Sequence, residues 1–194
     1  MKFPSFESAR KLVHLGGGLI PLFYLLLDLP KVQALFILGV LALPFLLADL
    51  LRLSRPALNR WFLRWFRGAM RPGEESRLTG ATYYLVACWL TILLFERTVA
   101  AAALLVLACG DTAASIIGQA LGGYRLGKGK TLSGTLAFLA TAFVVTLPFF
   151  PPATALGGAF IAAVAECLPL PLDDNLTIPL SAGITLTLFR PFPV

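Results

Sequence analysis

The sequence predicts an all-α, polytopic membrane protein: a helix bundle of six or seven transmembrane helices whose N-terminus is cytoplasmic. Of the 194 residues, 58% are hydrophobic and only 13% are charged, whereas soluble domains carry roughly a quarter charged residues. The mean hydropathy of +0.83 leaves too little polar surface to enclose a water-soluble core. The three cysteines stand singly in apolar stretches, so a secreted disulfide scaffold is excluded along with disordered and collagen-like chains.

Seven apolar segments supply the predicted helices, because about 20 apolar residues are needed to cross a hydrocarbon core of about 30 Å. The segments are residues 12–27, 32–53, 78–95, 99–121, 132–150, 153–168 and 176–189. The last two are short, and the seventh could instead be a re-entrant or tilted element. No cleavable signal peptide is apparent. We therefore expect one integral-membrane domain over residues 1–194.

The positions of lysine and arginine predict the orientation, since these residues collect on the cytoplasmic side. With the N-terminus inside, 13 of the 16 lysines and arginines fall on that side. Only Lys31, Arg97 and Arg190 fall outside. So uneven a split predicts a cytoplasmic N-terminus and a multi-pass chain.

Residues 55–71 are predicted to form an amphipathic helix on the inner leaflet. Arginines recur there at helical spacing with aromatic residues between them, which suits contact with lipid phosphates and headgroups: Arg60, Trp61, Phe62, Arg64, Trp65, Phe66 and Arg67. Nucleic-acid binding is the alternative for a basic aromatic stretch. We disfavour it because the neighbouring predicted transmembrane helix already holds this segment at the membrane.

Acids, bases and the only histidine gather at the predicted cytoplasmic ends of the helices, which favours an enzyme or binder at the inner leaflet. A transport pathway would place polar groups near the midplane. Arg10, Lys11 and His14 open the first helix and could contact phosphate, although His14 could equally be a helix cap. Glu75 precedes the third helix, where Thr79 is a plausible N-cap and Gly80 permits close packing.

Residues 110–135, GDTAASIIGQALGGYRLGKGKTLSGT, combine glycine, lysine and threonine at a density that suits a phosphate-binding loop. Glycine lets backbone N–H groups approach an anion and lysine neutralises it. The P-loop pattern GxxxxGK[ST] is not met in either alignment. When it is read from Gly122, Gly129 stands where Ser or Thr is required, and when it is read back from Lys130 and Thr131, Tyr124 stands where the first glycine should be. A plain cytoplasmic turn whose lysines only set the topology is the alternative.

Residues 166–179, ECLPLPLDDNLTIP, carry a group of hard oxygen donors of the kind that Mg²⁺ prefers. Asp173 and Asp174 are the candidate metal ligands, Glu166 is a third, and Asn175 is a further polar candidate. An Asp-Asp pair alone could be a solvated turn. A basic loop together with a carboxylate cluster favours a nucleotide phosphate with Mg²⁺.

The chain resembles the CTP-dependent lipid-alcohol kinases, a family that includes dolichol kinase, phytol kinase and the CTP-dependent diacylglycerol kinase. Four motifs in order carry the resemblance: RKLVHLGGGLIPL, ESRLTGATYYL, GDTAASIIGQALG with GKGKTLSGT, and AECLPLPLDDNLTIPL. Gln119 stands where members often have a basic residue, and Ser133 where an acid usually follows GK[ST]. The second departure removes one candidate metal ligand.

This resemblance implies a kinase that transfers a phosphoryl group from CTP, with Mg²⁺, to the hydroxyl of a polyprenol, phytol or diacylglycerol. A phosphatidate cytidylyltransferase that makes a CDP-lipid is the alternative reaction, and a transporter or scaffold is the non-enzymatic one. The residues assigned to the triphosphate are Lys128, Gly129, Lys130 and Thr131, with Arg10 and Lys11 near them.

Asp111 is the predicted catalytic residue, as a metal ligand or as the base that accepts the proton of the lipid hydroxyl. Ten residues separate it from Leu121 at the helix end, which puts it about 15 Å inside the membrane. The fourth helix must therefore break, or the inner face must be recessed.

Overall fold

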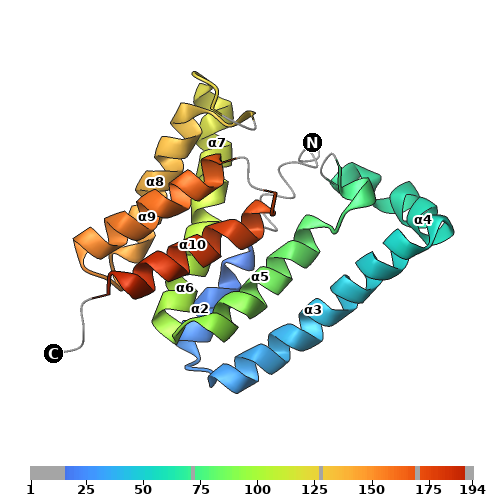
Figure 1. Ribbon diagram of the computed structural model, residues 1–194, viewed down its shortest axis with the longest axis horizontal. Coiled ribbons are helices and arrows are strands. Elements are labelled where there is room, and N and C mark those ends of the chain that lie inside the picture. Colours follow the sequence, from blue (N-terminus) through green and yellow to red (C-terminus); the bar gives the residue numbers. More distant parts are fainter. Residues whose placement is uncertain (1–15, 71–72, 127–128, 169–170, 191–194) are drawn as a thin grey trace, which may run out of the picture.

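The computed structural model describes residues 16–70, 73–126, 129–168 and 171–190, and every named element in these ranges is helical (Figure 1). The α-helices are α2 (Leu19–Leu26), α3 (Lys31–Ser54), α4 (Pro56–Phe66), α5 (Gly80–Leu94), α6 (Arg97–Leu105), α7 (Asp111–Leu121), α8 (Leu132–Thr146), α9 (Pro152–Cys167) and α10 (Asp174–Leu188). A π-helical segment, Val106–Gly110, joins α6 to α7, and short 3-10 turns lie at Arg67–Ala69 and Glu74–Ser76. The predicted all-α class is confirmed.

Two of the helical stretches, Lys31–Ser54 and Arg97–Leu121, are long and apolar enough to cross a membrane. They differ in what surrounds them, because 22% of the apolar window of the first is buried inside the protein against 67% of the second. Figure 1 shows α3 along the outer edge of the bundle, with α4 at its end. Large side chains such as Phe36 and Val40 point outward from α3, as expected of a helix that faces lipid. These features indicate a membrane protein.

The core is built around α6, where all seven residues from Val99 to Leu105 are buried. Four of these are alanines, which let neighbouring helices approach closely, as is common between membrane helices. α6 contacts α2, α5, α8 and α10. Further close approaches occur where Gly158 meets Leu186 and where Gly183 meets the Phe95 ring. Glycine thus permits the close packing of α10 against α9 and against the residue that follows α5.

A buried ion pair fixes the end of α3 against the start of α5. The Nε of Arg52 donates to Asp49 at 2.6 Å, and both side chains are almost wholly buried. Asp49 also accepts from the Thr79 amide at 2.7 Å and from the hydroxyl groups of Thr79 and Thr82 at 2.9 and 2.6 Å. Thr79 is the N-cap of α5, as predicted. The carboxylate thus joins two helices that are far apart in the chain.

The same arginine also holds the segment that follows α3. Its guanidinium donates to the Asn59 side chain in α4 at 3.1 Å and to the Glu74 carbonyl oxygen at 3.1 Å. It also donates to the Arg77 carbonyl oxygen and lies 5.0 Å from the centroid of the Phe62 ring. A buried charge is tolerated only when it is paired and hydrogen-bonded, and Arg52 meets both conditions.

Replacing Asp49 with alanine should lower the melting temperature of the detergent-solubilised protein. The charge of Arg52 would stay buried without its partner, a loss of about 3–5 kcal/mol. The matched control is Glu75→Ala, which removes the partner of Arg67 from an exposed pair of the kind worth about 0–1 kcal/mol. Equal losses of thermal stability in the two variants would contradict the structural role of the Asp49 carboxylate.

Candidate functional site

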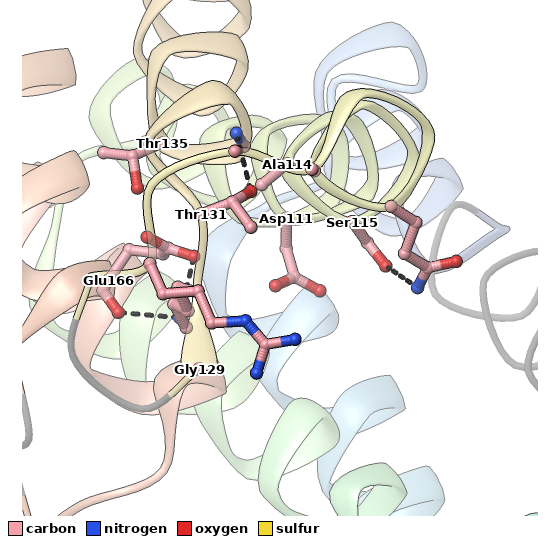
Figure 2. Close-up of a pocket in the computed structure, with 14 residues that line it drawn as sticks. Asp111, Ala114, Ser115, Gly129, Thr131, Thr135 and Glu166 are labelled. Atoms are coloured by element: carbon pink, nitrogen blue, oxygen red, sulfur yellow. Dashed lines mark hydrogen bonds and ion pairs between the residues drawn. The ribbon is translucent and has the colours of Figure 1, made fainter.

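A cleft of about 540 Å³ lies between α7, the start of α8 and the end of α9. Figure 2 shows the Asp111 side chain between Ser115 on one side and Thr131 and Glu166 on the other. The lining residues are Asp111, Ala114, Ser115, Gly118, Gln119, Gly122, Gly123, Arg125, Gly129, Lys130, Thr131, Gly134, Thr135 and Glu166. The cleft therefore unites the GDTAAS and GKGKT motifs with Glu166.

One face of α7 forms a wall of this cleft. Asp111, Ser115, Gly118 and Gly122 follow one another at helical intervals of four, three and four residues, so they lie in one row. The π-helical segment ends directly before Asp111, and such segments are frequent at functional sites. The hydrogen-bond pattern changes here, but the helix continues into α7 without a break. Asp111 at its start lines the cleft. The depth of Asp111 in a membrane, and with it the recessed inner face, stays a prediction.

The described parts of the loop between α7 and α8 pair in antiparallel fashion, since Arg125 and Thr131 form a bridge. Gly122, Gly123 and Gly129 have φ angles of 60°, 103° and 75°, a region that residues with a Cβ rarely adopt. The Leu126 amide donates to the Lys130 carbonyl oxygen at 2.7 Å. Thr131 then caps α8, because its hydroxyl oxygen accepts from the Gly134 amide at 3.2 Å. The glycines thus place the loop beside the helix start.

α7 and α8 touch at two glycines. A Cβ on Gly134 would lie 2.8 Å from the Ala114 carbonyl oxygen and 3.3 Å from the Gly118 Cα. A Cβ on Gly118 would lie 2.7 Å from the Thr131 hydroxyl oxygen. This contact sets the distance between the wall that carries Asp111 and the loop that carries Lys130 and Thr131.

Lys130 links three helices at the edge of the cleft. Its Nζ donates to the Glu166 carboxylate at 2.8 Å, to the Glu166 carbonyl oxygen at 2.6 Å and to the Asp174 carboxylate at 2.8 Å. Burial alone would lower the pKa of Lys130, but the charges of Asp174 and Glu166 outweigh this effect and raise the pKa above its usual value. The ammonium therefore stays charged at neutral pH and binds both carboxylates.

The chain is similar to proteins of the CTP-dependent lipid kinase group. It is 28% identical to CTP-dependent diacylglycerol kinase 1 of Schizosaccharomyces pombe, over 94% of this chain and 93% of that protein. It is 26% identical to an uncharacterized protein of Rickettsia prowazekii over 95% of both chains. A probable chloroplastic phytol kinase 3 of Glycine max is 29% identical over 54% of this chain and 39% of that protein.

No known family pattern matches the chain, and neither does any solved structure. The similarity to a CTP-dependent diacylglycerol kinase nevertheless extends over most of the chain. The similarities support the CTP-dependent lipid kinase family. The resemblance seen in the four sequence motifs is thereby confirmed.

The structure brings two of the predicted metal ligands, Glu166 and Asp174, together on the Lys130 ammonium. Asp173 caps α10, where its Oδ1 accepts from the Asn175 amide at 2.9 Å, while Glu166 and Asp174 both bind Lys130. Within the described ranges, no group of three or more His, Cys, Asp or Glu side chains is arranged to hold a metal ion. A Mg²⁺ site at these residues stays a prediction.

The other predicted site residues fall in three places. Gly129, Lys130 and Thr131 line the cleft with Asp111. Glu75 lies outside the cleft and pairs with Arg67 at 3.2 Å. Asn175, also outside the cleft, is buried, and its Nδ2 donates to the Gly80 carbonyl oxygen at 3.5 Å. Four further residues lie outside the described part of the chain: Arg10, Lys11, His14 and Lys128.

Nine residues of the cleft lining were not selected as site residues from the sequence, and four of these have polar side chains: Ser115, Gln119, Arg125 and Thr135. Ser115 could have been found from its position one helical turn after Asp111. Arg125 was interpreted only as one of the basic residues that predict the orientation, although it also lines the cleft. The Asp49–Arg52 pair was also missed, because acid and base three residues apart are common on exposed helices.

Gly134→Ala should destabilise the protein and disrupt the cleft, because its Cβ would meet backbone of α7 that cannot move independently. Gly157→Ala in α9 is the matched control, since its Cβ would lie 4.0 Å from the nearest atom, in Thr185. Alanine is favoured over glycine within helices by about 1 kcal/mol, so the control should be neutral or slightly stabilising. Melting temperatures in detergent measure both effects. A Gly134→Ala variant as stable as the control would contradict the close contact of α7 with α8.

Proposed function

We propose that the protein transfers the γ-phosphoryl group of CTP to the hydroxyl of a membrane lipid alcohol, such as a polyprenol, phytol or diacylglycerol. The observation that carries this proposal is the cleft in which Asp111 faces the GKGKT loop, in a chain similar to CTP-dependent diacylglycerol kinases. The hydroxyl oxygen forms a bond to the γ-phosphorus, the bond to the β,γ-bridging oxygen breaks, and CDP leaves. Such transfer depends on positioning and charge neutralisation.

Asp111 is the proposed acceptor of the hydroxyl proton. It lies about 15 Å along α7 from Leu121, and its side chain lines the cleft. A lipid alcohol comes from within the bilayer, so a base at this depth can meet it there. Ser115 lies one turn further along the same helix face and would hydrogen-bond the same hydroxyl.

Charge supports Mg²⁺ as the companion of the nucleotide. Three described acids lie in or beside the cleft, Asp111, Glu166 and Asp174, against two described bases, Arg125 and Lys130. A triphosphate added to this excess of one negative charge would be repelled. Mg²⁺ needs only one or two protein carboxylates when it also binds phosphates, and with Asp111 as the base, Glu166 is the carboxylate in the cleft lining that would bind it. When bound, it would neutralise charge on the transferring phosphoryl group.

We propose further that the chain crosses the membrane several times, with its N-terminus and the cleft on the cytoplasmic side. The uneven distribution of lysine and arginine supports this orientation. α4 would then lie on the inner leaflet: none of its residues is buried, and Trp61 and Trp65 are 60% and 69% exposed. Its amphipathic pattern suits the headgroup region.

Cysteine labelling tests this orientation at two exposed positions. In a variant whose native cysteines are replaced, Tyr124→Cys marks the loop beside the cleft and Asp28→Cys marks the turn after α2. A membrane-impermeant maleimide applied to sealed, right-side-out vesicles should label position 28 and leave position 124 unlabelled until the membrane is permeabilised. Labelling of both positions from one side would contradict the proposed topology.

Product analysis tests the proposed reaction with the purified protein, Mg²⁺ and CTP labelled at either the γ- or the α-phosphate. We expect CDP and a γ-labelled lipid phosphate when a panel of lipid alcohols is supplied. Asp111→Asn should reduce turnover at least about a hundredfold, the usual weight of a general base, while the protein still folds and inserts. Asp28→Asn, outside the cleft, is the matched control and should keep normal turnover.

Other results would contradict the proposed kinase reaction and favour one of the alternatives. Pyrophosphate and an α-labelled lipid, formed from phosphatidate, would identify a cytidylyltransferase. A purified protein that binds neither CTP nor Mg²⁺ would instead favour a transporter or scaffold. Near-normal activity of Asp111→Asn would remove Asp111 from the chemistry.

A further inference from the structure

Two cationic side chains line the described part of the cleft, Lys130 and Arg125. Both could in principle neutralise a phosphate, and the sequence alone favoured the lysine in the glycine-rich loop. The structure distinguishes them by what each side chain already binds.

The Lys130 ammonium has no donor left for a ligand. A lysine has three N–H donors, and the three acceptors around Nζ are two oxygens of Glu166 and one of Asp174, all within 2.8 Å. A phosphate would have to displace one of them. The three side chains together also carry one negative charge more than positive, which repels an anion.

The Arg125 guanidinium is in the opposite situation. It has five N–H donors, and the described part of the chain forms no hydrogen bond or ion pair with it. Its backbone, however, is fixed, since Arg125 pairs with Thr131 as an antiparallel bridge. The neighbouring Leu132 amide donates to the Tyr124 carbonyl oxygen at 2.9 Å. A fixed backbone with uncommitted donors at a cleft is the arrangement expected of a ligand-binding arginine.

We propose that Arg125 binds the phosphate oxygens of the nucleotide in this cleft, and that Lys130 is a structural link between α8, α9 and α10. The planar guanidinium forms two parallel hydrogen bonds to a phosphate, which a lysine cannot do. That the ligand is CTP rests on the proposed function. The assignment of Arg125 to phosphate does not, because it follows from the donors that each side chain has available.

Displacement of labelled CTP from the purified protein by inorganic tripolyphosphate, with Mg²⁺ present and no lipid alcohol, tests the assignment without turnover. Arg125→Ala should weaken binding of CTP and of tripolyphosphate by about ten- to a hundredfold, the usual effect of losing a charged hydrogen bond. Arg125→Lys should recover part of this loss, since it keeps the positive charge but cannot form the two parallel hydrogen bonds of a guanidinium. Arg64→Ala, an exposed arginine on α4, is the matched control and should bind both ligands normally.

Steady-state kinetics and thermal stability separate the two cations. Arg125→Ala should raise the KM for CTP while its melting temperature stays close to that of the unaltered protein. Lys130→Met should instead lower the melting temperature, because Glu166 and Asp174 would be left unpaired.

Three results would overturn the assignment: binding by Arg125→Ala within twofold of the unaltered protein, the same loss in the Arg64→Ala control, or no binding of tripolyphosphate by the unaltered protein. A CDP-lipid product would overturn the proposed kinase reaction alone, because tripolyphosphate binding would still decide the role of Arg125.

Discussion

Three helices meet at the Lys130 ammonium, and the cleft depends on the hydrogen bonds made there. α8 begins two residues after Lys130, α9 ends one residue after Glu166, and α10 begins at Asp174. Without the ammonium, two carboxylates would face each other at the edge of a membrane protein, where low polarity strengthens their repulsion. α7 is then positioned through its glycine contact with α8, and with it Asp111.

The polar contacts at this end of the bundle continue beyond the cleft. Asn175, next to Asp174 in the chain, donates to the Gly80 carbonyl oxygen at the start of α5. Thr79, next to Gly80, bonds to Asp49, which pairs with Arg52 and through it with Asn59 in α4. A series of contacts thus connects the cleft with the exposed amphipathic helix. The middle of the bundle, in contrast, is held by small apolar residues such as those of α6.

Much of the helical framework could be predicted because hydrophobic length and helix-breaking residues leave clear signals. The segment predicted at 32–53 is the helix Lys31–Ser54, and the one at 153–168 is Pro152–Cys167. Thr79 could be assigned as a cap because a hydroxyl before an apolar run satisfies free amide groups. The pairing of Lys130 with Glu166 could not be, because it joins residues 36 positions apart. Sequence motifs identify the charged residues of a site, but only the tertiary fold shows which of them are already paired with an opposite charge.

The π-helical segment has a consequence for how this chain can vary in length. A single residue turns an α-helix by about 100°, and a π segment commonly accommodates one extra residue within a helix. Val106–Gly110 therefore sets the angle between the buried alanines of α6 and the row that begins at Asp111. Substitutions within these five positions leave that angle intact as long as the side chains fit. An insertion or deletion among them would turn Asp111 away from the cleft, so a change in the length of this segment would disturb the site more than a change in its side chains.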